Sequence, residues 1–346
     1  MSNSPLVTIV TPSYNQAAYL EQTLQSVLAQ DYASIEYLVV DGASTDNSVD
    51  VIRRYASRLA WWTSEPDAGQ AEAINKGLKR ARGEIVAWMN SDDLYLPGAI
   101  TQAVATLQAE PEVGMVFGDA ITIDADGKPI NKLIFGDWGL EELARFRIIC
   151  QPAVFMRRSV LENAGYLDPS YHLLLDHQLW IRLARIAPIR HVSSLWAAAR
   201  HHPQAKNVAL AGKFGQEAIQ ILHWMETQPD LAGLIEQEHS HVLGGVYRLS
   251  ARYLLDSGQS QAASQEYWRA LRAWPSFALK HWHRMLYAIL CTAGIQTWAD
   301  ALRSKSVIRQ RQKLSFELQR DYFPKIGDEA NSENWPGLCL QARNLS

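Results

Sequence analysis

Two adjacent carboxylates, Asp92 and Asp93, follow a short apolar run and precede Leu94. Hard cations such as Mg²⁺ and Mn²⁺ prefer oxygen ligands and are usually held by one or two carboxylates together with substrate phosphates. Two neighbouring carboxylates could divide this work, one on the metal and one on a sugar hydroxyl. The alternative is that they cap a helix that begins near Pro97, because Asp is favoured at a helix N-cap.

Three further polar segments follow apolar runs, at residues 11–16, 41–46 and 67–70. The chain has no GxGxxG after its first apolar run and no GxxxxGK[ST], which disfavours a dinucleotide fold and a P-loop. Carboxylates cannot hold a phosphate directly, but a divalent cation bound to them can. These polar segments therefore favour a metal-assisted phosphate site.

The apolar runs predict strands at residues 6–10, 35–40, 59–63, 85–89 and 113–117. Amphipathic segments between them predict helices, and this alternation is typical of an α/β fold with a mostly parallel sheet flanked by helices. Ligands bind at the carboxyl ends of such strands. We therefore expect the polar segments to meet at one edge of the sheet.

Three motifs in this order, VTIVTPSYN at residues 7–15, VVDGASTD at 39–46 and NSDD at 90–93, resemble the family 2 glycosyltransferases of bacterial type. EPDAGQ at 65–70 and AINKG at 73–77 add a signature typical of one bacterial subset, and the resemblance weakens towards residue 225. It implies the GT-A fold, a Rossmann-like mostly parallel sheet that binds nucleotide-diphospho-sugars, and sugar transfer with inversion.

The resemblance also implies roles for single residues. It assigns Asp41 to the nucleotide base, Asp92 to the ribose and donor sugar, and Asp93 to a divalent metal, Mn²⁺ or Mg²⁺, with Asp92 and His202 as further candidate ligands. The full set of expected nucleotide-sugar contacts is Thr11, Pro12, Tyr14, Asn15, Asp41, Gln70, Asn75, Asp92 and Lys206. Ala43 departs from the family, where Gly is common, and is costly if its φ is positive.

Asp176 opens a predicted helix in the sequence DHQLWIRL. Its residue type suits a simple helix cap, whereas the resemblance makes it the catalytic base that takes a proton from an acceptor hydroxyl. His177 points about 100° around the helix from Asp176, so we assign it a supporting position.

RHHPQAKN at residues 200–207 keeps the His and Lys of the family pattern Arg-x-His-x-x-Ser-Lys-Thr, while Ala205 and Asn207 depart from it. A lysine beside a leaving diphosphate would offset the negative charge released when the glycosidic bond breaks. The alternative for Lys206 is a solvated basic loop.

Domain organisation follows from the change of pattern near residue 229. We expect a catalytic domain at 1–228, with a nucleotide-sugar half at 1–118 and an acceptor half at 119–228, then a helical region at 229–325 and a flexible tail at 326–346. Ala263, Tyr267, Ala270 and Pro275, with Gly258 in the turn, fit one tetratricopeptide-like hairpin.

Composition excludes several classes of protein. The 346 residues carry a net charge of −3, which disfavours a chain-wide nucleic-acid surface. Cys150, Cys291 and Cys339 lie far apart, so a disulfide scaffold is not expected. No signal peptide pattern opens the sequence, and we expect a cytoplasmic protein.

Residues 266–325 carry eleven Lys and Arg against four Asp and Glu, interleaved with Trp268, Trp274, Trp282 and Trp298. This composition fits peripheral contact with the cytoplasmic face of a membrane. It equally fits a helical subdomain whose tryptophans are core and whose basic residues are solvated.

Together with this resemblance, the sequence implies a metal-dependent hexosyl- or N-acetylhexosaminyl-transferase in cell-surface polysaccharide or glycolipid synthesis, with a saccharide or lipid-linked acceptor and no nucleic-acid partner. Inversion is implied by the resemblance alone. One alternative is a non-catalytic nucleotide-sugar-binding protein. The other is a nucleotidyltransferase, which would carry a Gly-rich basic loop after the first strand that residues 11–16 lack.

Overall fold

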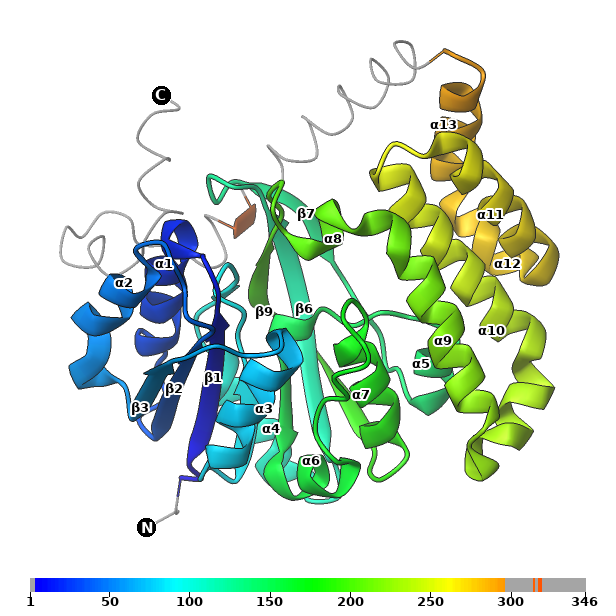
Figure 1. Ribbon diagram of the computed structural model, residues 1–346. Coiled ribbons are helices and arrows are strands. Elements are labelled where there is room, and N and C mark those ends of the chain that lie inside the picture. The colour runs from blue at the N-terminus through cyan, green and yellow to red at the C-terminus, as the bar shows by residue number, and fades with distance from the viewer. Residues whose placement is uncertain (1–3, 296–313, 315–316, 319–346) are drawn as a thin grey trace.

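The structure is a computed structural model that describes residues 4–295 together with Leu314, Glu317 and Leu318, and only the backbone of Asn207 and Val208. The expected tail at 326–346 and Trp298 lie outside these residues. Strands and helices alternate through the first half (Figure 1): β1 Val7–Ser13, α1 Ala17–Leu28, β2 Ile35–Asp41, α2 Ser48–Tyr55, β3 Trp61–Ser64, α3 Gln70–Arg80, β4 Ile85–Trp88, β5 Leu94–Tyr95 and α4 Ala99–Ala109.

The second half begins with a strand pair and continues with short helices. Its elements are β6 Met115–Ile123, β7 Pro129–Leu133, α5 Leu140–Ala144, the 3₁₀ turn η2 Gln151–Ala153, β8 Val154–Arg157, α6 Arg158–Ala164, α7 Leu175–Ala184, β9 Ile189–Arg200 and α8 Lys206–Ala209. All five predicted strands of the first half exist, within a few residues of their expected bounds.

The strands form one nine-stranded sheet in the order β3-β2-β1-β4-β8-β6-β9-β5, with β7 paired to β6. β1, β2, β3 and β4 pair in parallel, as do β6 and β9. β8 runs antiparallel to β4 and β6, β7 to β6, and β5 to β9. The parallel pairing expected for most of the sheet therefore holds in its first half, and the whole sheet is mixed.

The turn between β6 and β7 explains part of this difference. The Asp124 amide donates to the Lys128 carbonyl at 2.9 Å, and Gly127 has a φ of +82°. A tight turn of this kind joins only antiparallel strands.

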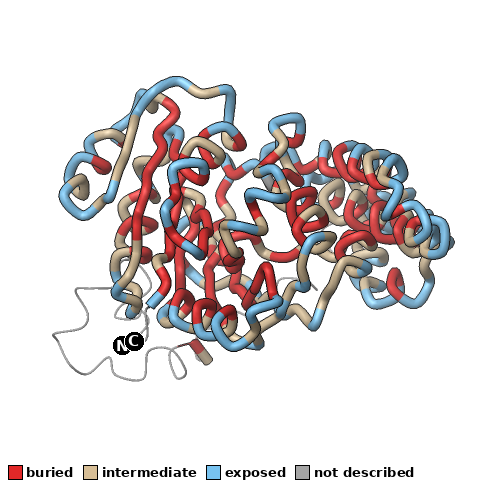
Figure 2. The backbone as a smooth tube through the Cα atoms, turned by 90° about the horizontal axis from the view of Figure 1, so that it is seen from below, coloured by how far each residue is buried: buried red, intermediate tan, exposed pale blue. Residues whose placement is uncertain are grey.

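The sheet is buried because its strands are apolar on both faces. β1, β4 and β6 are buried along their whole length, and Figure 2 shows buried residues concentrated in the strands and on the inner faces of the helices. The carboxyl ends of β1, β2 and β4 place Ser13, Asp41 and residues 90–93 at one edge of the sheet, as the sequence predicts.

In the described residues that follow β9 and α8, the elements are helical: η3 Ala211–Lys213, α9 Phe214–Glu226, α10 Pro229–Asp256, α11 Ser260–Ala273, α12 Pro275–Ala278, η4 Leu279–His281 and α13 Trp282–Thr292. α10 and α11 pack as a hairpin, with Gly258 at a φ of +79° in the turn. Val242 and Val246 of α10 share one hydrophobic core with Trp88 and Trp180. The helical region is thus built onto the sheet domain.

Two described leucines beyond α13 also contact the sheet. Leu314 and Leu318 are buried against Leu94, Ile121 and other residues of β5, β6 and β9. Among the described residues, the structure contains no helix long and apolar enough to cross a membrane.

Candidate active site

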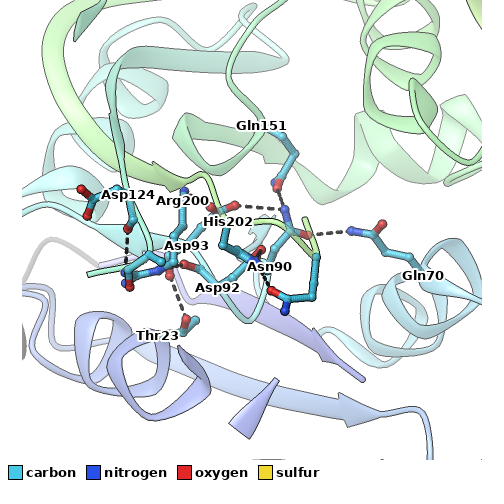
Figure 3. A network of polar contacts seen from close by, with 11 residues as sticks. Thr23, Gln70, Asn90, Asp92, Asp93, Asp124, Gln151, Arg200 and His202 are labelled. Carbon is cyan, nitrogen blue, oxygen red and sulfur yellow. Dashed lines mark hydrogen bonds and ion pairs between the residues drawn. The ribbon is translucent and has the colours of Figure 1, made fainter. Parts of the chain in front are cut away.

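Asp93 is the centre of a polar network at the end of β4 (Figure 3). Its carboxylate accepts the backbone amide of Arg200 at 2.8 Å and the side-chain amide of Asn90 at 3.1 Å. The residue is only 6% exposed. The N-cap of α4 is Gly98, so neither carboxylate of the Asp92–Asp93 pair serves as the helix cap that the sequence left open.

The electrostatics of Asp93 indicate excess negative charge. Burial raises the pKa of its carboxyl to about 8, and the neighbouring charge of Asp92 acts in the same direction against the two hydrogen bonds from Arg200 and Asn90. A buried carboxyl that resists ionisation beside a second carboxylate is stabilised as an anion when a cation lies nearby.

Asp92 is tied to the end of β9. The imidazole Nε2 of His202 lies 3.0 Å from the Asp92 carboxylate, and this hydrogen bond raises the pKa of His202. The guanidinium Nε of Arg200 donates to the Asp92 carbonyl oxygen at 2.9 Å. His202 and Arg200 thus bring the segment after β9 against the segment after β4, which are more than a hundred residues apart.

These residues fit a divalent cation that is shared with a substrate. No three His, Cys, Asp or Glu side chains in the described part of the chain converge as a complete ligand set. Asp92 and Asp93 nevertheless supply the oxygen donors that Mg²⁺ and Mn²⁺ prefer, and such ions commonly use one or two carboxylates and complete their coordination with phosphates and water. Both ring nitrogens of His202 are engaged, Nε2 by Asp92 at 3.0 Å and Nδ1 by Gln204 at 3.2 Å.

A chain of amides extends from this network to Lys206. Asn90 donates to Gln151 at 2.9 Å and accepts from Gln70 at 2.8 Å, and Gln70 in turn accepts from the Lys206 ammonium at 2.8 Å. Lys206 is itself exposed. Gln70 and Lys206 are therefore in direct contact on one side of the Asp93 network.

Asp41 lies fully buried at the end of β2. Its carboxylate accepts the amide of Ser44 at 2.9 Å, the hydroxyl of Ser44 at 2.6 Å and the hydroxyl of Ser64 at 2.7 Å. Three donors to one carboxylate fix it in place.

The segment after β1 is joined to the segment after β2 through Asn15. The Asn15 side-chain oxygen accepts the backbone amide of Thr45 at 2.8 Å, and the Asn15 backbone amide donates to the hydroxyl of Ser44 at 2.8 Å. Tyr14 beside it is 62% exposed. Thr11 and Pro12 are buried in β1, and the Thr11 hydroxyl pairs with that of Tyr37 at 2.9 Å, so the Thr11 side chain faces the core.

Ala43 adopts the left-handed conformation that the sequence marked as costly, with a φ of +59°. Gly42 cannot be replaced freely, because a Cβ there would lie 2.7 Å from the Asp67 carboxylate.

Asn75 has a different environment from the other expected donor contacts. Its amide group donates to the Leu167 carbonyl at 2.8 Å and accepts the Leu167 amide at 3.0 Å. Both polar atoms are therefore engaged by the segment between α6 and α7.

Asp176 is the second residue of α7, whose N-cap is Leu174. It is not the helix cap, and its carboxylate accepts the amide of the next residue, His177, at 2.7 Å. Burial raises the pKa of Asp176 to about 6, and the negative charge of Glu217 acts in the same direction. A carboxylate of this kind is ionised at neutral pH yet basic enough to accept a proton.

His177 is fully buried and lies 5.2 Å from the Phe146 ring. Burial lowers its pKa to about 4, so it is neutral at neutral pH. This environment fits the supporting position expected from the sequence.

Glu217 of α9 holds the segment that leads into α7. Its carboxylate accepts three successive backbone amides, those of His172 at 2.8 Å, Leu173 at 2.7 Å and Leu174 at 2.5 Å. Leu174 is the residue before α7. Glu217 therefore fixes the position of the first turn of this helix, which carries Asp176.

Cys150 connects the two carboxylate groups electrostatically. Burial raises the pKa of its thiol, and the negative charges of Asp93 and Asp176 raise it further. Asp93 and Asp176 therefore both act electrostatically on the same buried thiol.

Several residues of this network were not expected from the sequence, namely Thr23, Asn90, Gln151, Arg200 and Glu217. Asn90 and Arg200 stand inside the recognised motifs, and their polar character next to Asp92 and His202 could have indicated them. Thr23, Gln151 and Glu217 carry no local signal, because their roles depend on contacts between distant segments.

Known proteins with similar sequences include glycosyltransferases. The model of the family described as "Glycosyl transferase family 2" matches residues 8–164. The putative teichuronic acid biosynthesis glycosyltransferase TuaG of Bacillus subtilis is 35% identical over 187 residues, which are 52% of this chain and 73% of TuaG. The chain belongs to glycosyl transferase family 2.

Other relatives of this family 2 chain are longer. The O-antigen biosynthesis protein RfbC of Myxococcus xanthus is 29% identical over 218 residues, 61% of this chain and 17% of RfbC. An uncharacterized glycosyltransferase of Rickettsia felis is 29% identical over 210 residues, 58% of this chain and 35% of its own. The chain thus spans about a third or less of the length of these two relatives.

Solved structures confirm the fold of the family 2 chain as GT-A. The mannosyltransferase PcManGT from Pyrobaculum calidifontis, in complex with GDP-Man and Mn²⁺, gives a TM-score of 0.57 at 22% identity and covers 86% of this chain and 88% of its own. S. aureus TarS 1–349 in complex with UDP-GlcNAc gives 0.56 at 17% identity, with 91% of both chains covered.

Proposed function

We propose that this chain transfers a sugar from a nucleotide-diphosphate sugar to an acceptor hydroxyl, with inversion and with a divalent metal. The observation that carries the proposal is that Asp176, a carboxylate with a pKa of about 6, and Asp93 of the polar network both act electrostatically on the buried thiol of Cys150. Membership of glycosyl transferase family 2 supports it.

The donor would bind at the carboxyl ends of β1, β2 and β4. Asp41 is a fixed hydrogen-bond acceptor for the nucleotide base, and exposed Tyr14 is a platform on which a base can stack. Asn15 would line this site from the loop after β1, while the buried Thr11 and Pro12 would support it from within β1. Asn75 supports it indirectly through Leu167.

The diphosphate would lie between the Asp93 network and Lys206. Asp93, with Asp92 and His202 beside it, would hold Mn²⁺ or Mg²⁺, which when bound supplies Lewis-acid stabilisation of the leaving diphosphate. Lys206, held by Gln70, adds a positive charge on the same side. Asp92 is free to accept from the ribose or donor sugar with its remaining lone pairs.

Asp176 would act as the general base. It removes the proton from an acceptor hydroxyl while that oxygen attacks the anomeric carbon and the bond to the nucleotide diphosphate breaks. A single displacement inverts the configuration at that carbon. Asp176 lies in the first turn of α7, where the helix dipole stabilises the ionised form of its carboxyl.

The names of two relatives mention teichuronic acid and O-antigen biosynthesis, and two fold neighbours hold GDP-Man with Mn²⁺ or UDP-GlcNAc. They support a hexose or N-acetylhexosamine donor and a role in cell-surface polysaccharide or glycolipid synthesis. The acceptor is then a saccharide or a lipid-linked saccharide at the cytoplasmic side.

A panel of UDP- and GDP-sugars with Mn²⁺, offered to the native chain and to Asp176→Asn, tests this function. We expect Mn²⁺-dependent cleavage of at least one donor by the native chain, and a loss of about 10²–10⁴-fold in Asp176→Asn, the contribution of a general base. Nucleotide binding without turnover of any donor would favour the non-catalytic binding protein. Release of diphosphate from a nucleoside triphosphate and a sugar phosphate would favour the nucleotidyltransferase.

A further inference from the structure

The last described helix presents an apolar face to solvent. Leu279 of η4 and Trp282, Leu286 and Ile289 of α13 are 55%, 61%, 46% and 52% exposed. Their spacing of three, four and three residues places them on one side of the helix. Ala288 instead is buried in the cluster that joins α10, α11 and α13. α13 therefore has one face that packs on the protein and another apolar face that meets no described residue closely enough to bury it.

Two tryptophans of this region are exposed. Trp282 is 61% exposed and Trp268 of α11 is 60% exposed, whereas Trp274 is half-buried and stacks on Phe277. A subdomain whose tryptophans are all core residues does not account for Trp268 and Trp282. A contiguous exposed apolar face on a globular protein marks an interaction site.

The charge of this region is positive. Arg272 of α11 and Lys280 of η4 are exposed, and Glu266, the only carboxylate between residues 266 and 295, is paired with Arg269 at 2.7 Å. The excess continues along the sequence, since residues 266–325 carry eleven Lys and Arg against four Asp and Glu in a chain of net charge −3. A second copy of this chain would bring the same positive charge to a symmetric contact. A negatively charged surface is the complementary partner.

Exposed Trp, Leu and Ile combined with Lys and Arg are what a helix lying in the surface of an anionic bilayer uses. Figure 1 shows α13 at the upper end of the molecule. β1 runs upwards in the same view, so its carboxyl end points towards that side. We propose that the face formed by Leu279, Trp282, Leu286 and Ile289 docks on an anionic phospholipid surface, with Arg272 and Lys280 against the headgroups. This docking goes beyond the proposed sugar transfer, and its binding test does not depend on activity.

Sedimentation of the full chain with vesicles tests the proposal. Wild type should bind vesicles that contain phosphatidylglycerol, bind pure phosphatidylcholine vesicles more weakly, and lose binding as salt is added. The double variant Leu286→Gln, Ile289→Gln should bind at least about tenfold more weakly, since it removes apolar area that enters the bilayer. The matched control is Ile219→Gln on α9, which is 43% exposed and should bind as wild type does.

Two controls separate docking from folding and from activity. The double variant should keep the melting temperature of wild type and its rate of donor-sugar hydrolysis in solution. The proposal is overturned if wild type does not bind anionic vesicles, if the double variant binds as well as wild type, or if light scattering shows a salt-insensitive dimer that the double variant loses.

Discussion

Glu217 and Leu174 lie 43 residues apart in the chain, yet the Glu217 carboxylate accepts the Leu174 amide at 2.5 Å. Leu174 is the N-cap of α7, and Asp176 follows two residues later. The helical region after β9 thus contacts the segment that leads to the proposed base, through the Glu217 carboxylate. Its negative charge also contributes to the raised pKa of Asp176.

Glu217→Gln should therefore change the proposed reaction without touching the substrate. A neutral amide cannot accept three backbone amides as a carboxylate does, so Asp176 is misplaced and kcat falls about 10- to 100-fold. Loss of the negative charge lowers the pKa of Asp176, and the acidic limb of the kcat profile moves to lower pH. Glu226→Gln on the same helix should leave both unchanged. A Glu217→Gln protein with the wild-type pH profile would limit Glu217 to a packing role.

The pH dependence of wild type follows from Asp176. The base must be ionised, and its pKa is about 6, so kcat/KM should be constant near neutral pH and fall about tenfold per pH unit below about 6. Initial rates between acidic and neutral pH at saturating Mn²⁺ measure this. Activity that persists unchanged well below that pKa would exclude Asp176 as the base.

We expect Asp93→Asn to abolish the response of activity to metal while the protein still folds. Asn90 and Arg200 donate to different oxygens of the Asp93 carboxylate, so the amide keeps one of these hydrogen bonds and loses the other, while no buried carboxylate remains at this position to be ionised. We expect a melting temperature within a few degrees of wild type and a loss of about 10²–10³-fold in kcat/KM. Chelation should inactivate wild type reversibly, and added Mn²⁺ should not restore Asp93→Asn. Full Mn²⁺ activation of the variant would contradict the assignment.

Much of the fold was predictable because the first strands are short apolar runs with polar ends, and their order places Asp41 and Asp93 at one edge. β8 was harder to place, since its four residues carry no signal of antiparallel pairing with β4 and β6. Within the site, motif residues such as Asp93 and Asp176 could be singled out. Glu217 could not, because its role arises only when α9 packs against the segment before α7.

Ala43 gives a stability prediction independent of activity. Its φ of +59° costs an L-residue about 1–2 kcal/mol that glycine does not incur. After the greater flexibility of glycine in the unfolded chain is subtracted, Ala43→Gly should raise the free energy of unfolding by about 0.5–1 kcal/mol. Urea unfolding measures it, with Gly42→Ala, which would crowd Asp67, as a variant expected to lose stability.

The proposed placement of Asp93 and Asp176 around one substrate is tested most directly by a crystal structure of the chain with a nucleotide-diphosphate sugar and Mn²⁺, with the metal located by its anomalous signal. We expect the Mn²⁺ peak beside the Asp93 carboxylate and the anomeric carbon on the side that Asp176 faces. A metal bound away from Asp93, or a sugar whose anomeric carbon is shielded from Asp176, would contradict the account.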